Sequence, residues 1–265
     1  MHMENHSQDN SVVIYQIIFS GPLLLAMVFY LIAVIVSIRL YNKQWPIYRT
    51  IFFILGILSA STAVIGPIAE NAHFSFVVHM FGHLLLGMIS PLLLALAAPM
   101  TLVLRTLPVK HARRLTKILR SSPIRILSNP LFTTIFNVGG MWLLYTTNLY
   151  MLMQQHILMH ILVHIHVFLA GYLFTISMIY IDPTPHRTSF LYRSIVLVLA
   201  LAAHGTLSKY VYAHPPSGVS VSQAEMGGML MYYGGDMIEL LLIFILCLQW
   251  YKATRPRVLL SNSQV

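Results

Sequence analysis

Charged residues are scarce in this sequence, and cysteine is nearly absent. Only 9% of the 265 residues are Asp, Glu, Lys or Arg, whereas 57% are hydrophobic. A soluble domain carries about 25% charged residues, so a chain this apolar has too little polar surface to stay in solution. The single cysteine, Cys247, excludes a disulfide framework and a metal site built from several thiolates.

Acidic residues are also few, and the net charge is +9. A basic chain binds nucleic acid when Lys and Arg share an exposed face with aromatic or polar residues. Here Lys and Arg flank apolar runs, so we expect no nucleic-acid partner and attribute the charge to membrane topology. No cleavable signal peptide is evident, because the first apolar run is too long for a signal core and its positive charges follow it.

Long apolar runs predict the fold. They cover residues 12–38, 48–69, 74–104, 131–149, 156–181, 191–212 and 226–250. A transmembrane helix needs about 20 apolar residues, and a helix satisfies its own backbone hydrogen bonds within the lipid. The sequence therefore predicts an all-α, polytopic membrane helix bundle of about seven transmembrane helices, which form a single transmembrane domain over residues 1–265 in the lipid bilayer.

Lys and Arg mark alternate loops between these runs. Three follow the first run, seven lie between residues 105 and 125, two follow the fifth run and three lie in the C-terminal tail. The exception is Lys209, near the end of the sixth run. Because cytoplasmic loops are enriched in Lys and Arg, the pattern predicts an external N-terminus and a cytoplasmic C-terminus.

Histidines inside the apolar runs form the main candidate site. The third, fifth and sixth runs hold His79, His83, His160, His164, His166 and His204. Residues four apart share a helix face, and the predicted topology brings these imidazoles to a similar depth in the outer half of the membrane. Ionisable groups in transmembrane segments usually face the bundle interior and mark functional sites.

Several ligands suit such a cluster. Imidazole and thioether groups suit copper, and methionines lie at similar depths, namely Met80, Met159, Met226 and Met229. The lack of thiolate or carboxylate partners disfavours structural zinc. Haem is the direct competitor, because imidazoles of facing helices also ligate haem iron. A haem-binding redox protein and a copper or proton-coupled transporter are therefore alternatives. Asp236 and Glu239 lie on one face of the last run. They would relay protons along part of a transport path, orient a ligand histidine, or make a polar contact between helices.

Particular segments resemble a known family. The stretch His79-Met-Phe-Gly-His83, followed by Pro91 and Ala98-Pro99, is similar to the signature of the CtaG-type cytochrome c oxidase assembly factors of bacteria. Further similar segments are His164-Ile-His166, Asp182-Pro-Thr-Pro185 and Met226-Gly-Gly-Met229. Where the family often has Asp-Gln before the glycine pair, this sequence reads Ala224-Glu225.

The resemblance implies a metallochaperone in the plasma membrane of a bacterium that supports formation of the CuB centre of haem-copper oxidase. On this basis we expect no catalysed reaction. We expect copper, as Cu(I), to bind transiently to His79, His83, His160 and His164, with His166 and His204 as supplementary ligands. The implied partners are cytochrome c oxidase subunit I or its assembly intermediate and a copper donor protein.

Overall fold

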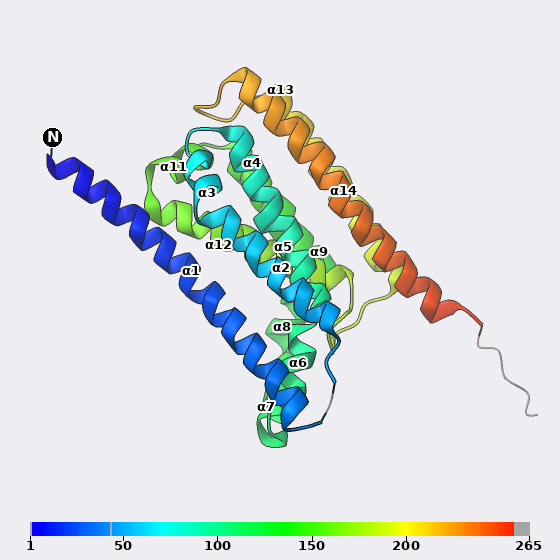
Figure 1. The fold of residues 1–265 in the computed structure, drawn as a ribbon. Helices are drawn as coiled ribbons and strands as arrows, with labels where there is room; N and C mark the ends of the chain where they lie inside the picture. Colours follow the sequence, from blue (N-terminus) through cyan, green and yellow to red (C-terminus); the bar gives the residue numbers. More distant parts are fainter. Residues whose placement is uncertain (1, 43, 257–265) are drawn as a thin grey trace, which may run out of the picture.

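The computed structural model describes residues 2–42 and 44–256, with side chains described from residue 18 onward. This part of the chain consists of helices and loops without a β-strand (Figure 1), as the sequence predicts. The α-helices are α1 (His2–Arg39), α2 (Ile47–Val64), α3 (Pro67–Ala72), α4 (Phe76–Leu84), α5 (Ser90–Leu96), α6 (Pro99–Thr106), α7 (Val109–Leu119), α8 (Ser122–Leu127), α9 (Pro130–Thr134), α10 (Gly140–Thr146), α11 (Leu149–Gln155), α12 (Ile157–Met178), α13 (Phe190–Ala213) and α14 (Val221–Thr254). The π-helical turns η1 (Leu85–Ile89) and η2 (Ile135–Gly139) join α4 to α5 and α9 to α10.

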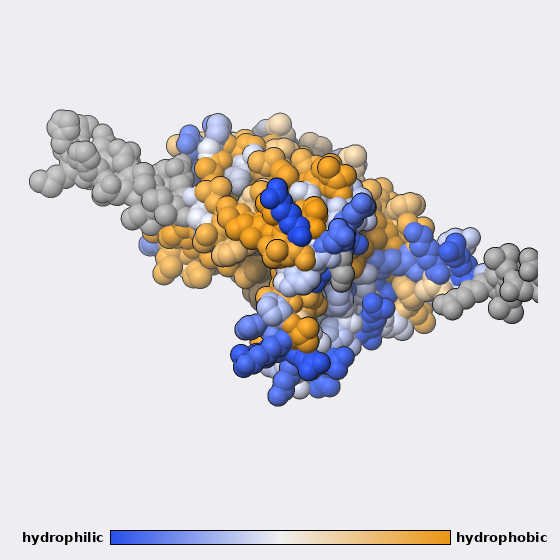
Figure 2. Space-filling model, turned by 60° about the horizontal axis from the view of Figure 1, so that its bottom comes forward, coloured by the Kyte–Doolittle hydropathy of each residue, from blue (hydrophilic) through white to orange (hydrophobic). Residues whose placement is uncertain are grey.

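Six segments of the described chain are long and apolar enough to cross a membrane. They are Ile18–Arg39, Ile47–Val64, Phe76–Leu96, Ile157–Met178, Phe190–Ala213 and Val221–Thr254. Large apolar side chains on their outer surfaces are exposed, among them Leu24, Ile195 and Phe244, and hydrophobic surface covers much of the sides of the molecule (Figure 2). Lipid is the solvent that such a surface requires, so the membrane bundle predicted from composition is confirmed.

The fourth predicted run, 131–149, is a shorter composite helix. It consists of α9, η2 and α10, which contain 5, 5 and 7 residues. Before this segment, Asn129 accepts a hydrogen bond from the Tyr192 hydroxyl near the start of α13, and after it, Asn148 accepts one from Ser217 beyond the end of α13. The composite helix therefore passes between the same two ends of the bundle as α13 does.

The third predicted run, 74–104, is too long at its C-terminal end. The helical segment ends at Leu96, and Ala98 adopts a left-handed conformation with φ of 51° before α6 begins at Pro99. Proline lacks the N–H that would continue the helix and disfavours helical geometry in the residue before it. The apolar character of residues 99–104 belongs to a separate short helix.

The loops rich in Lys and Arg meet at one end of the bundle. The Arg105 guanidinium donates to the Gln44 carbonyl oxygen at 3.1 Å, which joins the loops after the first and third spans. The rings of Phe190, at the start of α13, and Trp250, near the end of α14, stack with their centroids 5.9 Å apart. We call this the basic end, which also carries α7 (Figure 1) and is hydrophilic in Figure 2. Its predicted position is cytoplasmic.

Asp182, in the loop after α12, holds the beginning of α6 at the basic end. Its carboxylate accepts hydrogen bonds from the backbone N–H of Met100 at 3.1 Å, and from the N–H and hydroxyl of Thr101 at 2.7 and 2.6 Å. The first N–H groups of a helix have no partner inside the helix, and negative charge is favourable there. Two of the segments singled out in the sequence, Ala98-Pro99 and Asp182-Pro183, thus meet in space.

Candidate functional site

Buried histidines from three spans lie in the half of the bundle away from the basic end. They occupy α4 and the first turn of α12, which run toward the basic end, and the later turns of α13, which runs away from it. The buried members are His79, His83, His160 and His204, with 3–7% of each residue exposed. The chain thus places these costly polar groups inside the helix bundle, away from lipid.

Four histidines form a series of ring contacts that leads inward from the surface. Exposed His73, which follows α3, stacks on His160 with ring centroids 4.9 Å apart, and His160 stacks on His164 at 4.2 Å. The His164 ring meets that of His79 on α4 edge to face at 6.4 Å. We call His73, His160, His164 and His79 the histidine ladder.

Hydrogen bonds orient the rings of the ladder. Nδ1 of His164 lies 2.8 Å from the carbonyl oxygen of His160. A carbonyl only accepts, so Nδ1 donates, and in the neutral ring Nε2 carries the lone pair. His79 Nε2 lies 3.2 Å from the hydroxyl of Tyr145, and His73 Nδ1 lies 3.2 Å from the side-chain oxygen of Gln154.

Deeper in the bundle, a cavity lies between His83 and His204. We call it the inner cavity; its lining residues are His83, Gly87, Met88, Asn137, Val138, Met141, Phe174, Thr175, Ala200, His204, Ile238, Glu239 and Leu242. Within the described residues, the Nε2 atoms of His83 and His204 are buried and have no hydrogen-bond partner. Buried polar atoms are usually satisfied, so these two nitrogens are candidates for a ligand contact.

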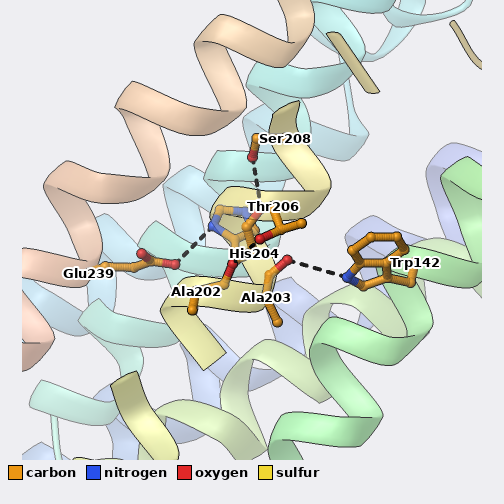
Figure 3. A network of polar contacts seen from close by, with 7 residues as sticks. All are labelled: Trp142, Ala202, Ala203, His204, Thr206, Ser208 and Glu239. Carbon is orange, nitrogen blue, oxygen red and sulfur yellow. Dashed lines mark hydrogen bonds and ion pairs between the residues drawn. The ribbon is translucent and has the colours of Figure 1, made fainter. Parts of the chain in front are cut away.

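A carboxylate from the last span orients His204 (Figure 3). Oε1 of Glu239 lies 2.9 Å from Nδ1 of His204, and both side chains are buried. Gly235, one turn before Glu239 on α14, makes room for this ring, because a Cβ there would lie 2.5 Å from His204 Cε1. The close approach of α14 and α13 at Gly235 therefore serves the placement of His204.

Three expected contributors lie elsewhere. His166 is on the opposite face of α12 from His164, with its ring 4.5 Å from that of Phe136, and it occupies the space that a Cβ on Gly140 would need. Met226 and Met229 are 52% and 44% exposed and face away from the bundle interior. The ladder and the inner cavity therefore contain neither His166 nor these two thioethers.

The histidines are arranged in pairs and in a stacked series. Among residues whose positions are described, no group of three or more His, Cys, Asp or Glu side chains is close enough to hold one metal ion. The apolar runs do not include His73, although it precedes His79 by only six positions. The pairing of His204 with Glu239 depends on the register between two helices, which the sequence does not indicate.

Comparisons with known proteins agree with the sequence resemblance. The model of the family "Cytochrome c oxidase caa3 assembly factor (Caa3_CtaG)" matches residues 28–253. An uncharacterized protein of Mycobacterium leprae is 26% identical over 242 residues, and uncharacterized proteins of Mycobacterium bovis and Mycobacterium tuberculosis are each 27% identical over 240 residues. These matches cover 83% of this chain but only 36–37% of the relatives, so the chain spans little more than a third of their length. No solved structure matches the chain.

Proposed function

Because the chain belongs to the cytochrome c oxidase caa3 assembly factor family and is a multi-pass bacterial membrane protein, we propose that it binds Cu(I) through its intramembrane histidines. The ion is cargo, which the protein passes to the CuB centre of a haem-copper oxidase. On this proposal the protein acts by binding and release and catalyses no reaction.

The observation that carries the proposal is the continuous series of imidazoles between the surface and the interior. The ladder begins at exposed His73 and continues through His160 and His164 to buried His79, and His83 follows one turn later on α4. An ion entering at His73 would meet a new imidazole at each step.

The ligand type suits an ion that must leave again. Neutral imidazole is a good ligand for copper, and the hydrogen bond from Nδ1 of His164 to the backbone carbonyl of His160 fixes the orientation of that ring. Pairs of imidazoles without thiolate hold Cu(I) less tightly than a cysteine site would. The ladder is therefore better suited to transfer than to storage.

The partners follow from the proposed direction of transfer. The ladder opens at the end of the bundle opposite the basic end. By the positive-inside rule, that opposite end lies outside the cytoplasm. A copper donor protein would load His73 from that side. The acceptor would be subunit I of the oxidase or its assembly intermediate, in contact with the lipid-facing helices.

The test is the copper content and activity of the oxidase isolated from cells that carry His83→Ala or His164→Ala. We expect oxidase polypeptides and haem to be present, with copper and activity as low as in a strain that lacks the protein. His166→Ala is the matched control, because His166 lies in the same span as His164 but outside the ladder. Normal oxidase copper and activity in the first two strains would contradict the proposal. A stoichiometric Soret band in the purified protein would favour the haem alternative.

A further inference from the structure

Glu239 is a carboxylate inside the membrane half-way along α14, and the ladder does not use it. Only 6% of the residue is exposed. An acidic group at this depth is costly and usually has a partner and a function. Its partner is Nδ1 of His204, at 2.9 Å (Figure 3).

This contact fixes which nitrogen of His204, a residue that lines the inner cavity, carries the lone pair. A carboxylate accepts hydrogen bonds, so Nδ1 carries the proton, and Nε2 of the neutral ring is then an acceptor. An imidazolium would instead place a buried N–H without an acceptor at Nε2, which is unfavourable. Among the described residues Nε2 has no hydrogen-bond partner, as expected for a lone pair that is available to an ion.

A second imidazole and two thioethers border the same space. His83 reaches the inner cavity from α4, and its buried Nε2 likewise has no partner in the described structure. Met88 and Met141 also line the cavity. Imidazole and thioether donors together favour a soft ion such as Cu(I).

We propose that the inner cavity is a binding site for one soft monovalent cation, Cu(I), with the Nε2 atoms of His83 and His204 as ligands and the Glu239 carboxylate as counter-charge. This inference rests on the proposed function and makes it specific to one site. Glu239 positions His204 and neutralises the charge of the ion without touching it. One carboxylate balances one monovalent ion, whereas a divalent ion would leave an uncompensated positive charge in a low-dielectric interior.

The first test is metal binding by the purified full chain in detergent. Ag(I), which resembles Cu(I) and is redox-inert, and Cu(I) are titrated against a competing chelator. For every variant, the binding measured for the same variant with His83→Ala added is subtracted, so that only the ion at the inner cavity is counted. We expect Glu239→Gln, which keeps a hydrogen-bond acceptor but loses the charge, to bind Cu(I) and Ag(I) about 100-fold more weakly.

Two further variants accompany this measurement. Glu239→Asp keeps the charge and should retain part of the affinity. Asp236→Asn is the matched control, because Asp236 lies on the same helix, is partly exposed and does not line the cavity, and it should bind like the wild type. Unchanged affinity in Glu239→Gln would overturn the inference.

A gain of charge provides a second test that does not depend on the folding of Glu239→Gln. Asn137 lines the same cavity, and Asn137→Asp would add a second negative charge there. We expect the affinity for Zn(II) to rise relative to that for Ag(I) by about 100-fold. An unchanged ratio would overturn the charge argument.

The outcomes separate the two proposals. If the wild type binds no Cu(I), the proposed function fails and this inference fails with it. If the wild type binds Cu(I) and His160→Ala weakens binding while His204→Ala and Glu239→Gln do not, the inner site is wrong and the proposed function stands.

Discussion

Replacing Asp182 tests how the loop after α12 controls the short helix α6. We expect Asp182→Ala to destabilise α6 by about 2 kcal/mol, because loss of a helix cap costs about 0.5–2 kcal/mol and loss of a negative charge at a helix N-terminus about 0.3–1 kcal/mol. The structure supports the upper part of this range, since the carboxylate accepts from two backbone N–H groups and from the Thr101 hydroxyl. Asp182 is partly exposed, which keeps the loss below the full cost of three charged hydrogen bonds.

Asp182→Asn separates charge from geometry. The amide keeps one oxygen that can accept from Thr101, but its nitrogen cannot accept from the N–H of Met100. We therefore expect an intermediate loss of about 1 kcal/mol.

Amide hydrogen exchange in detergent measures this effect locally. A loss of 2 kcal/mol corresponds to a roughly 30-fold increase in the opening of α6, so the amides of residues 102–106 should exchange faster by about that factor if α6 opens by itself. The amides of α13 should keep their protection and are the internal control. Wild-type exchange of α6 in the Asp182→Ala protein would refute the capping argument.

Two other predictions follow from packing and topology. Gly171→Ala should destabilise the protein by about 1–3 kcal/mol, because its Cβ would overlap the backbone of Gly87. Gly139→Ala should be neutral or slightly stabilising in thermal unfolding, because the nearest neighbour of its Cβ, Ile135 Cγ2, is 3.9 Å away. Equal unfolding midpoints for the two variants would contradict the packing argument. Reporter fusions at residue 115, in α7, should be cytoplasmic, and fusions at residue 218, after α13, external; both reporters on one side would show that the predicted topology is wrong.

The membrane fold could be predicted from the sequence because it depends on composition and run length. The ends of the helices were harder to predict, since residues 97–104 are as apolar as the span before them. The Ala98-Pro99 pair was the local signal for the break, and the left-handed Ala98 shows its effect. The fourth span is short because polar turns precede α9 and follow α10. The length of the predicted run, 19 positions, does not show where these turns begin.

The candidate site was predictable in part. The spacing of His160 and His164 correctly indicated one helix face, and the same geometry could have excluded His166, because two residues along a helix correspond to a rotation of about 200°. The pairing of His204 with Glu239 could not be predicted, because it depends on the register of α13 against α14. The close packing of Gly235 against His204 is part of that register. His73 belongs to the ladder through tertiary contacts alone.

The two π-helical turns border the inner cavity, since η1 contributes Gly87 and Met88 and η2 contributes Asn137 and Val138. Each such turn holds one residue more than the α-helical turn it replaces, because its hydrogen bonds join residues five apart instead of four. A relative that lacks one of these turns would need a one-residue gap in its alignment with this chain, within residues 85–89 for η1 or 135–139 for η2. Without that gap, every later residue of the span would be compared with a position about 100° away around the helix, and a cavity-lining residue would be matched to one that faces lipid.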